Sequence, residues 1–98
     1  MSDSTNMNYR LPHEATLKNA AKLSIVEDKP IMFDYWTMSI DKTALIGAKE
    51  SNEKLLVKNE EEYTSTIVKF YKCKTELIVI TENSIYIVDS EIPTRKIS

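Results

Sequence analysis

The sequence predicts an all-β domain, an antiparallel meander of six to seven short strands that closes as a small barrel or compact sandwich, with one short N-terminal helix. Three observations lead to this class. Apolar and polar residues alternate along much of residues 23–88, where β-branched and aromatic types are common. Polar turn residues interrupt these stretches at short intervals. Finally, 98 residues with 42% hydrophobic and 29% charged side chains suit one globular domain.

The start of the chain follows a helical pattern instead. Leu17, Ala20 and Ala21 recur at helical spacing. Pro12 suits the first turn of a helix, where its missing N–H removes no hydrogen bond. We therefore expect a short helix over residues 13–22.

The strands are expected where the alternation is strongest. Ile31, Phe33 and Tyr35 would share one face of a long strand. The run from Leu77 to Ile80 is apolar on both faces, which is typical of a central strand. The expected strands cover residues 23–26, 31–40, 43–49, 54–58, 64–72, 76–81 and 84–88. Residues 1–10 and 92–98 lack apolar periodicity, so we expect flexible tails on either side of a single domain over residues 11–91.

The residue inventory excludes several kinds of chemistry. Cys73 and His13 are the only cysteine and histidine, too few for one chain to build a four-ligand zinc site. Gly47 is the only glycine, which excludes glycine-rich phosphate-binding loops. The run from Glu60 to Glu62 lacks the alternating ligands and central glycine of a calcium loop. We expect no metal, no cofactor and no enzymatic activity.

Cys73 has two interpretations. It is either a small, partly buried apolar residue or a reactive thiol activated by the flanking Lys72 and Lys74. A single cysteine forms no internal disulfide, which fits a reducing compartment, so we expect a cytoplasmic location. The apolar runs are too short to span a membrane, and we expect no membrane association.

Two groups of residues are candidates for function. The densest cluster of aromatic and sulfur side chains is a candidate protein interface, with core packing as the alternative: Phe33, Asp34, Tyr35, Trp36 and Met38. Aromatic side chains near lysines on strands form a candidate surface for a nucleotide or single-stranded nucleic acid: Tyr63, Lys69, Tyr71, Asn83 and Tyr86. Against nucleic acid stand the net charge of −2 and the location of both arginines, Arg10 and Arg95, in the expected tails.

The segments Tyr63–Val68 and Thr81–Tyr86, with the pattern TS-x-[IV], a polar turn and T-x-NS-x-Y, resemble a terminal hairpin of small all-β proteins of bacteriophages and large DNA viruses. The resemblance covers about a quarter of the chain. It implies an all-β fold and a virus- or phage-encoded protein. Some phage proteins with similar hairpins are anti-defence factors that sequester nucleotide signals, so the resemblance also implies that function.

From these observations we expect a non-catalytic interaction protein. It would act by self-association, most simply as a two-fold dimer, and by binding a host or viral protein or a small ligand. The alternative is a nucleotide- or single-stranded nucleic-acid-binding β module. Retention on heparin at low salt that disappears at moderate salt would favour the alternative.

Overall fold

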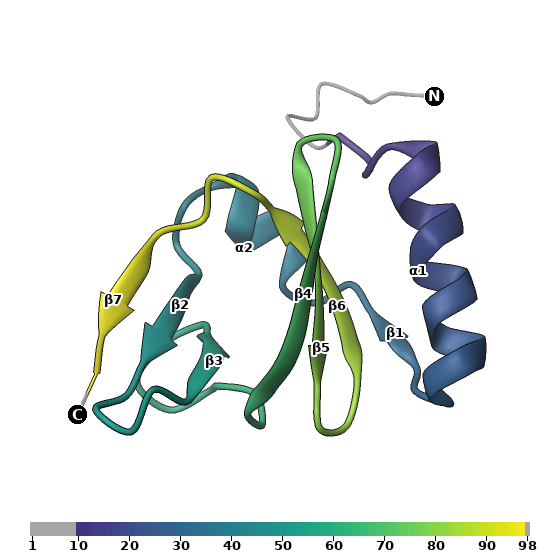
Figure 1. Cartoon of the computed structure of the whole chain (residues 1–98). Coiled ribbons are helices and arrows are strands. Elements are labelled where there is room, and N and C mark those ends of the chain that lie inside the picture. Colours follow the sequence, from purple (N-terminus) through teal and green to yellow (C-terminus); the bar gives the residue numbers. More distant parts are fainter. Residues whose placement is uncertain (1–9, 98) are drawn as a thin grey trace.

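The computed structural model describes residues 10–97, and within them the chain forms seven strands and two helices (Figure 1). Helix α1 (Glu14–Glu27) comes first. The elements that follow are β1 (Ile31–Met32), α2 (Trp36–Ile40), β2 (Leu45–Ala48), β3 (Lys54–Val57), β4 (Ile67–Cys73), β5 (Glu76–Thr81), β6 (Ile85–Asp89) and β7 (Thr94–Lys96). They build a four-stranded sheet of order β1-β6-β5-β4 and a three-stranded sheet of order β3-β2-β7.

The four-stranded sheet lies between α1 and the three-stranded sheet (Figure 1). Alternate residues of β5 and β6 supply the two cores, because successive side chains of a strand point to opposite faces. The core on the α1 side contains Ala20, Trp36, Ile78, Ile80, Ile85 and Ile87. The core between the sheets contains Tyr35, Ala44, Ile46, Leu56, Val79, Val88 and Ile92. Strands β5 and β6 are therefore covered on both faces, as the apolar run at residues 77–80 predicts.

The prediction of an all-β domain with one short helix is confirmed in part: the domain is mainly β, but it also contains the second helix α2. Closure into a barrel is wrong, because the strands form two separate sheets. The prediction of a purely antiparallel meander is also wrong. Strand β1 pairs in parallel with β6, and β2 pairs in parallel with β7. The segments expected at residues 43–49, 54–58, 64–72, 76–81 and 84–88 each overlap a strand, β2 to β6 in turn.

The strand expected at residues 23–26 is the last part of α1. Leu17, Ala20 and Leu23 pack together on the sheet at helical spacing, and this contact outweighs the strand preference of the β-branched Ile25 and Val26. The helix ends at Asp28, whose backbone is left-handed with φ 57°. The N–H of Asp28 donates to the carbonyl oxygen of Ser24, which closes the last turn.

The long strand expected at residues 31–40 is also wrong. Only Ile31 and Met32 are extended, and α2 occupies the second half of the segment. The N–H of Trp36 donates to the carbonyl oxygen of Phe33 at 3.1 Å, so the chain turns between them. Trp36 and Ser39 are the buried residues of α2, one helical turn apart.

The second expected tail, residues 92–98, contains ordered structure. Ile92 is buried in the core between the sheets, and β7 lies in parallel beside β2. Gly47 of β2 leaves room for the side chain of Ile97, since a Cβ atom at residue 47 would lie 2.7 Å from Cδ1 of Ile97. Of the first expected tail, residues 1–9 lie outside the described residues, and Arg10 is held by side-chain contacts described below.

Candidate functional site

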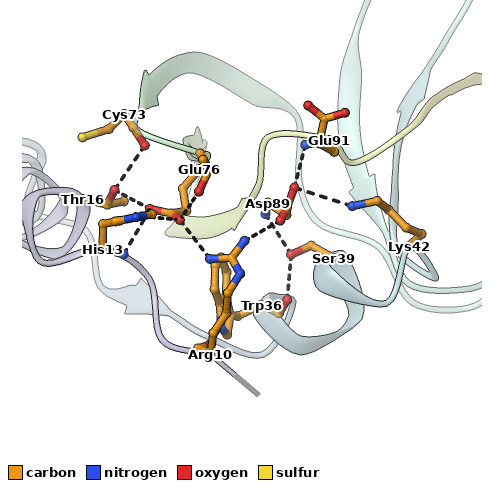
Figure 2. A network of polar contacts seen from close by, with 11 residues as sticks. Arg10, His13, Thr16, Trp36, Ser39, Lys42, Cys73, Glu76, Asp89 and Glu91 are labelled. Carbon is orange, nitrogen blue, oxygen red and sulfur yellow. Dashed lines mark hydrogen bonds and ion pairs between the residues drawn. The ribbon is translucent and has the colours of Figure 1, made fainter. Parts of the chain in front are cut away.

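Two carboxylates lie side by side at one end of the four-stranded sheet. Glu76 of β5 and Asp89 of β6 are direct partners in the antiparallel ladder. Glu76 is fully buried and Asp89 is 7% exposed. The guanidinium of Arg10 bridges them, with one nitrogen 3.1 Å from Oε2 of Glu76 and another 2.6 Å from Oδ2 of Asp89 (Figure 2). One cation therefore stabilises both charges.

Further donors surround the Glu76 carboxylate. The hydroxyl of Thr16 lies 2.6 Å from Oε1, and the hydroxyl of Thr75 lies 2.8 Å from Oε2. The backbone N–H of His13 donates to Oε1 at 3.1 Å, and its Nδ1 lies 2.9 Å from Oε2. Burial alone would raise the pKa of Glu76, but these hydrogen bonds outweigh it and lower the pKa to about 2. Glu76 is therefore ionised at neutral pH.

Asp89 joins the same network to α2. Its N–H donates to Oγ of Ser39 at 2.9 Å, and the Ser39 hydroxyl donates to the carbonyl oxygen of Trp36 at 2.6 Å (Figure 2). Its Oδ1 accepts the N–H of Glu91 at 2.8 Å and lies 3.6 Å from Nζ of Lys42. Asp89 thereby fixes α2 and the chain after β6 to the end of the sheet.

Arg10 and Trp36 hold each other in two ways. The indole Nε1–H donates to the carbonyl oxygen of Arg10 at 2.7 Å. The guanidinium lies 5.0 Å from the centre of the indole ring, a cation–π contact. The whole arrangement attaches the segment before α1 to the sheet. Its acceptors are bound by protein donors, and the contacts attach this segment to the end of the sheet.

A second candidate site is the exposed outer edge of strand β4. Strand β4 is an edge strand of the four-stranded sheet, and its five central residues, 68 to 72, are all exposed. Val68 is 55% exposed, Phe70 38% and Tyr71 41%, large values for apolar and aromatic side chains on a strand. Lys69 and Lys72 on the same strand are also exposed. A long edge strand of this kind is available for pairing with another chain.

The hydrogen-bond pattern shows which backbone groups of β4 point outward. The N–H of Thr81 donates to the carbonyl oxygen of Ser84, so Thr81, Val79 and Leu77 direct their backbone groups toward β6. The intervening residues of β5 are Ile80, Ile78 and Glu76, and they pair with Lys69, Tyr71 and Cys73 of β4.

It follows that Phe70 and Lys72 direct their N–H and C=O groups away from β5. Within residues 10–97, no backbone hydrogen bond reaches these outward groups.

The corresponding edge of the other sheet is covered. The N–H of Thr64 donates to the carbonyl oxygen of Leu56, and the N–H of Lys58 donates to the carbonyl oxygen of Glu62. Val57 and Tyr63 form a bridge beside them. Residues 62–64 thus occupy the outer side of β3, and β7 at the opposite edge has only three residues. Among the described strands, β4 offers the longest free edge.

The surface also has two hollows. A groove of about 620 Å³ lies on the outer face of the three-stranded sheet, with Leu55, Val57 and Ile97 beside Tyr63 and Lys58. A smaller hollow of about 340 Å³ lies between α1 and β4. Its lining residues come from the helix and from the neighbouring strands: Asn19, Lys22, Leu23, Tyr71, Lys72, Cys73 and Ile78. Successive side chains of β4 point to opposite faces, so Tyr71 faces α1 and the Lys72 side chain lies on the other face.

The candidate interface at residues 33–38 is divided between surface and core. Phe33 and Asp34 are exposed, and Asp34 lies 3.5 Å from Nζ of Lys58. Tyr35 is buried in the core between the sheets, and Trp36 is buried in the core on the α1 side. Met38 is half-buried against the former. For Tyr35, Trp36 and Met38 the structure matches the core alternative.

The candidate ligand surface is scattered. Lys69 and Tyr71 share the α1-facing side of β4, but Tyr63 lies beside the groove of the other sheet. Asn83 lies in the turn between β5 and β6. Tyr86 is half-buried and meets Tyr35 edge to face, with 5.2 Å between ring centres. Burial, the neighbouring Tyr86 and nearby carboxylates raise the pKa of Tyr35 to about 12, and burial likewise raises the pKa of Tyr86.

The sequence reasoning missed Arg10, Glu76 and Asp89. A signal was present, because Glu76 shares a face with the buried Ile78 and Ile80, where a charge requires a partner. The turn at residues 82–83 then places Asp89 opposite Glu76. The position of Arg10 carries no comparable signal, since it lies 66 residues before Glu76 in the sequence.

No group of three or more histidine, cysteine, aspartate or glutamate side chains within residues 10–97 is arranged to hold a metal ion. In the same part of the chain no helix is long and apolar enough to cross a membrane. No protein-family model, curated protein or solved structure matches the chain.

Proposed function

We propose that this chain is a non-catalytic protein-interaction domain whose docking element is the free edge of β4. The observation that carries the proposal is the outward direction of the backbone groups of Phe70 and Lys72, which no other backbone group in residues 10–97 satisfies. A partner strand laid along this edge gains backbone hydrogen bonds at both residues, and its side chains meet Phe70 on one face and Tyr71 on the other.

The chemistry elsewhere in the chain supports a binding role over a catalytic one. The buried carboxylate Glu76 is ionised and held by donors from three segments of the chain. The exposed aromatic side chains of β4 instead offer contact area of the kind that interfaces use.

The test removes one backbone donor from the edge. Proline in place of Lys72 lacks the N–H, and an edge strand tolerates it where that N–H faces outward. Lys72→Ala is the matched control, because it removes the same side chain and keeps the N–H. Phage-displayed random peptides are selected for binding to the wild-type protein. They should bind the Lys72→Ala variant, and their affinity for the Lys72→Pro variant should be at least about tenfold lower. This factor corresponds to the loss of at least one hydrogen bond between uncharged groups.

Two measurements decide the result. Amide NMR shifts of residues 69–73 should move on peptide addition to the wild-type protein, and circular dichroism should show that Lys72→Pro remains folded. Peptides that bind Lys72→Pro as tightly as the control, or whose shifts map to another surface, would overturn the proposal.

A second candidate function rests on the hollow between α1 and β4. The aromatic ring of Tyr71 beside Lys22 of α1 is suited to stack a base and hold a phosphate. This is the nucleotide-binding alternative, and it accords with the resemblance to phage hairpins of anti-defence factors.

Titration with ATP and with single-stranded oligothymidylate distinguishes this candidate. Binding that shifts the Tyr71 signals, weakens at higher salt and is lost in Lys22→Glu would support it. The matched control is Lys18→Glu, an exposed lysine on the same helix that does not line the hollow. Equal binding by the two variants, or no binding to the wild-type protein, would exclude this site.

A further inference from the structure

We infer that the partner of the β4 edge is a second copy of this chain, paired antiparallel about a two-fold axis that passes between the two Tyr71 residues. The inference rests on the proposed docking function of β4 and names its occupant and register. Two arguments lead to it: the direction of the backbone groups along β4 and the distribution of its charges.

The backbone restricts the possible registers. In an antiparallel pair, only residues that direct their backbone groups toward the partner strand form hydrogen-bonded pairs. On β4 these are Phe70 and Lys72, so the two-fold axis must pass through a residue position and not between two residues, since only then do outward residues lie opposite one another. Among the exposed residues of β4, Val68 lies at the irregularity of the ladder, which leaves Lys69, Phe70, Tyr71 and Lys72 as possible centres.

Repulsion between like charges and the irregularity in the β4 ladder exclude three of these four registers. A centre at Lys69 or at Lys72 places two identical ammonium groups directly opposite each other, which is destabilising. A centre at Phe70 places Lys72 opposite Val68, and Val68 lies where the β4 ladder shifts register, so regular pairing stops there.

The centre at Tyr71 uses only residues 69–73, where the β4 ladder is regular. Tyr71 then lies opposite Tyr71 of the second copy, a closely spaced aromatic pair. Phe70 lies opposite Lys72 of the second copy in a hydrogen-bonded pair, with the ammonium beside the ring. Lys69 lies opposite Cys73, and within its own chain it already has Glu27 at 4.0 Å.

This arrangement also accounts for the exposure of the edge. The two four-stranded sheets join into one continuous sheet, and both α1 helices lie on the same face, one on each side of the tyrosine pair. The pairing is closed, because each copy uses β4 and neither β4 edge remains free for a third copy. Exposed aromatic side chains on β4 are covered in the same step.

A cysteine placed at residue 69 reports the register directly. Lys69→Cys would face the native Cys73 of the second copy in a non-hydrogen-bonded pair, a spacing at which disulfides form readily. Within one chain the two residues are four positions apart on an extended strand, too far to bond. Val68→Cys is the control, because it neighbours the same site but faces no cysteine in this register.

The experiment combines mass and cross-linking. Light scattering at micromolar concentration should give twice the 11.3 kDa chain mass, and Lys72→Pro should weaken the dimer at least tenfold relative to Lys72→Ala. Mild oxidation should convert Lys69→Cys, and not Val68→Cys, into a covalent dimer, whether or not the proline variant folds.

The outcomes separate the inference from the function on which it rests. If the protein is a monomer at every concentration, the partner of β4 is not a second copy. The docking function would still hold if peptides selected on the wild-type protein, acidic ones included, bind Lys72→Pro less tightly than Lys72→Ala. A dimer without the 69–73 cross-link would overturn the register. A dimer equally stable in Lys72→Pro and Lys72→Ala would overturn the use of β4.

Discussion

Glu76 and Asp89 face each other across β5 and β6, and the same guanidinium holds both carboxylates. Two like charges directly opposite on a sheet repel each other, and here one of them is fully buried. Arg10 offsets this repulsion, together with the other donors to Glu76 and with Lys42 beside Asp89. The shared cation links the segment before α1 to the end of the sheet, so one residue near the start of the chain contributes to the stability of the whole domain.

Replacing Arg10 by alanine should destabilise the fold by about 2 kcal/mol. The variant leaves two adjacent carboxylates without their shared cation and removes the contact with the Trp36 ring. The figure lies at the lower end for such pairs because the Arg10 side chain is 42% exposed. Urea unfolding midpoints measure the loss. Arg95→Ala, at an exposed position of β7, should change stability by less than about 0.5 kcal/mol.

Stability should fall with acid in a window set by Glu76. Its pKa in the folded protein is about 2 against an ordinary 4.5, so its contribution is fully present above about pH 5 and is lost as the pH falls through 2. The contribution amounts to at most about 3 kcal/mol. Glu76→Gln should be less stable than wild type at pH 7, and the difference should shrink between pH 5 and 2. An unchanged difference, or the same narrowing in the exposed-site control Glu82→Gln, would contradict this assignment.

Trp36 should act as a core residue. Trp36→Ala should cost about 3 to 5 kcal/mol, since it empties a buried site between α1 and the sheet. Trp36→Phe keeps an aromatic ring and loses the hydrogen bond to the Arg10 carbonyl oxygen, so it should cost less. Circular dichroism follows the unfolding, because both variants lack the fluorophore. An alanine variant as stable as wild type would show that the buried position contributes little.

Removing residues 93–98 should lower the melting temperature by about 10 °C. The deletion removes β7 and exposes the side of β2 on which β7 pairs, and about 1 kcal/mol shifts a domain of this size by 4 to 8 °C. Gly47→Ala perturbs the same contact more mildly, since the new methyl group meets Ile97 at 2.7 Å and that side chain must move. Differential scanning calorimetry measures both. A melting temperature unchanged by the deletion would mean that β7 contributes nothing to the fold.

Local pattern was sufficient to locate the hairpins. Strands β4, β5 and β6 follow one another with short turns, and their alternation and turn residues are visible in the sequence. The parallel pairs were not predictable, because Ile31 and Ile85, or Ile46 and Thr94, carry no local mark of their partnership. Residues 23–26 combine strand-forming residues with helical spacing, and the contact of Leu23 with the sheet decides between the two.

The candidate site was partly predictable for a similar reason. Lys69 and Tyr71 could be placed on one face of a strand from their spacing, and the structure does so. That β4 would be an edge strand depends on which strands lie beside it, which is a property of the whole chain. Trp36 and Tyr35 could not be assigned to opposite cores, because the turn at Phe33 breaks the alternation on which the interface hypothesis relied.

The pairing of β7 with β2 has a consequence for synthesis in the cell. Strand β2 is complete by residue 48, but its parallel partner is made only at residues 94–96. During synthesis the three-stranded sheet cannot be completed until those residues have been made and are free to fold, after every strand of the four-stranded sheet has been made. Until then the side of β2 that pairs with β7 presents an unpaired edge to whatever the nascent chain meets.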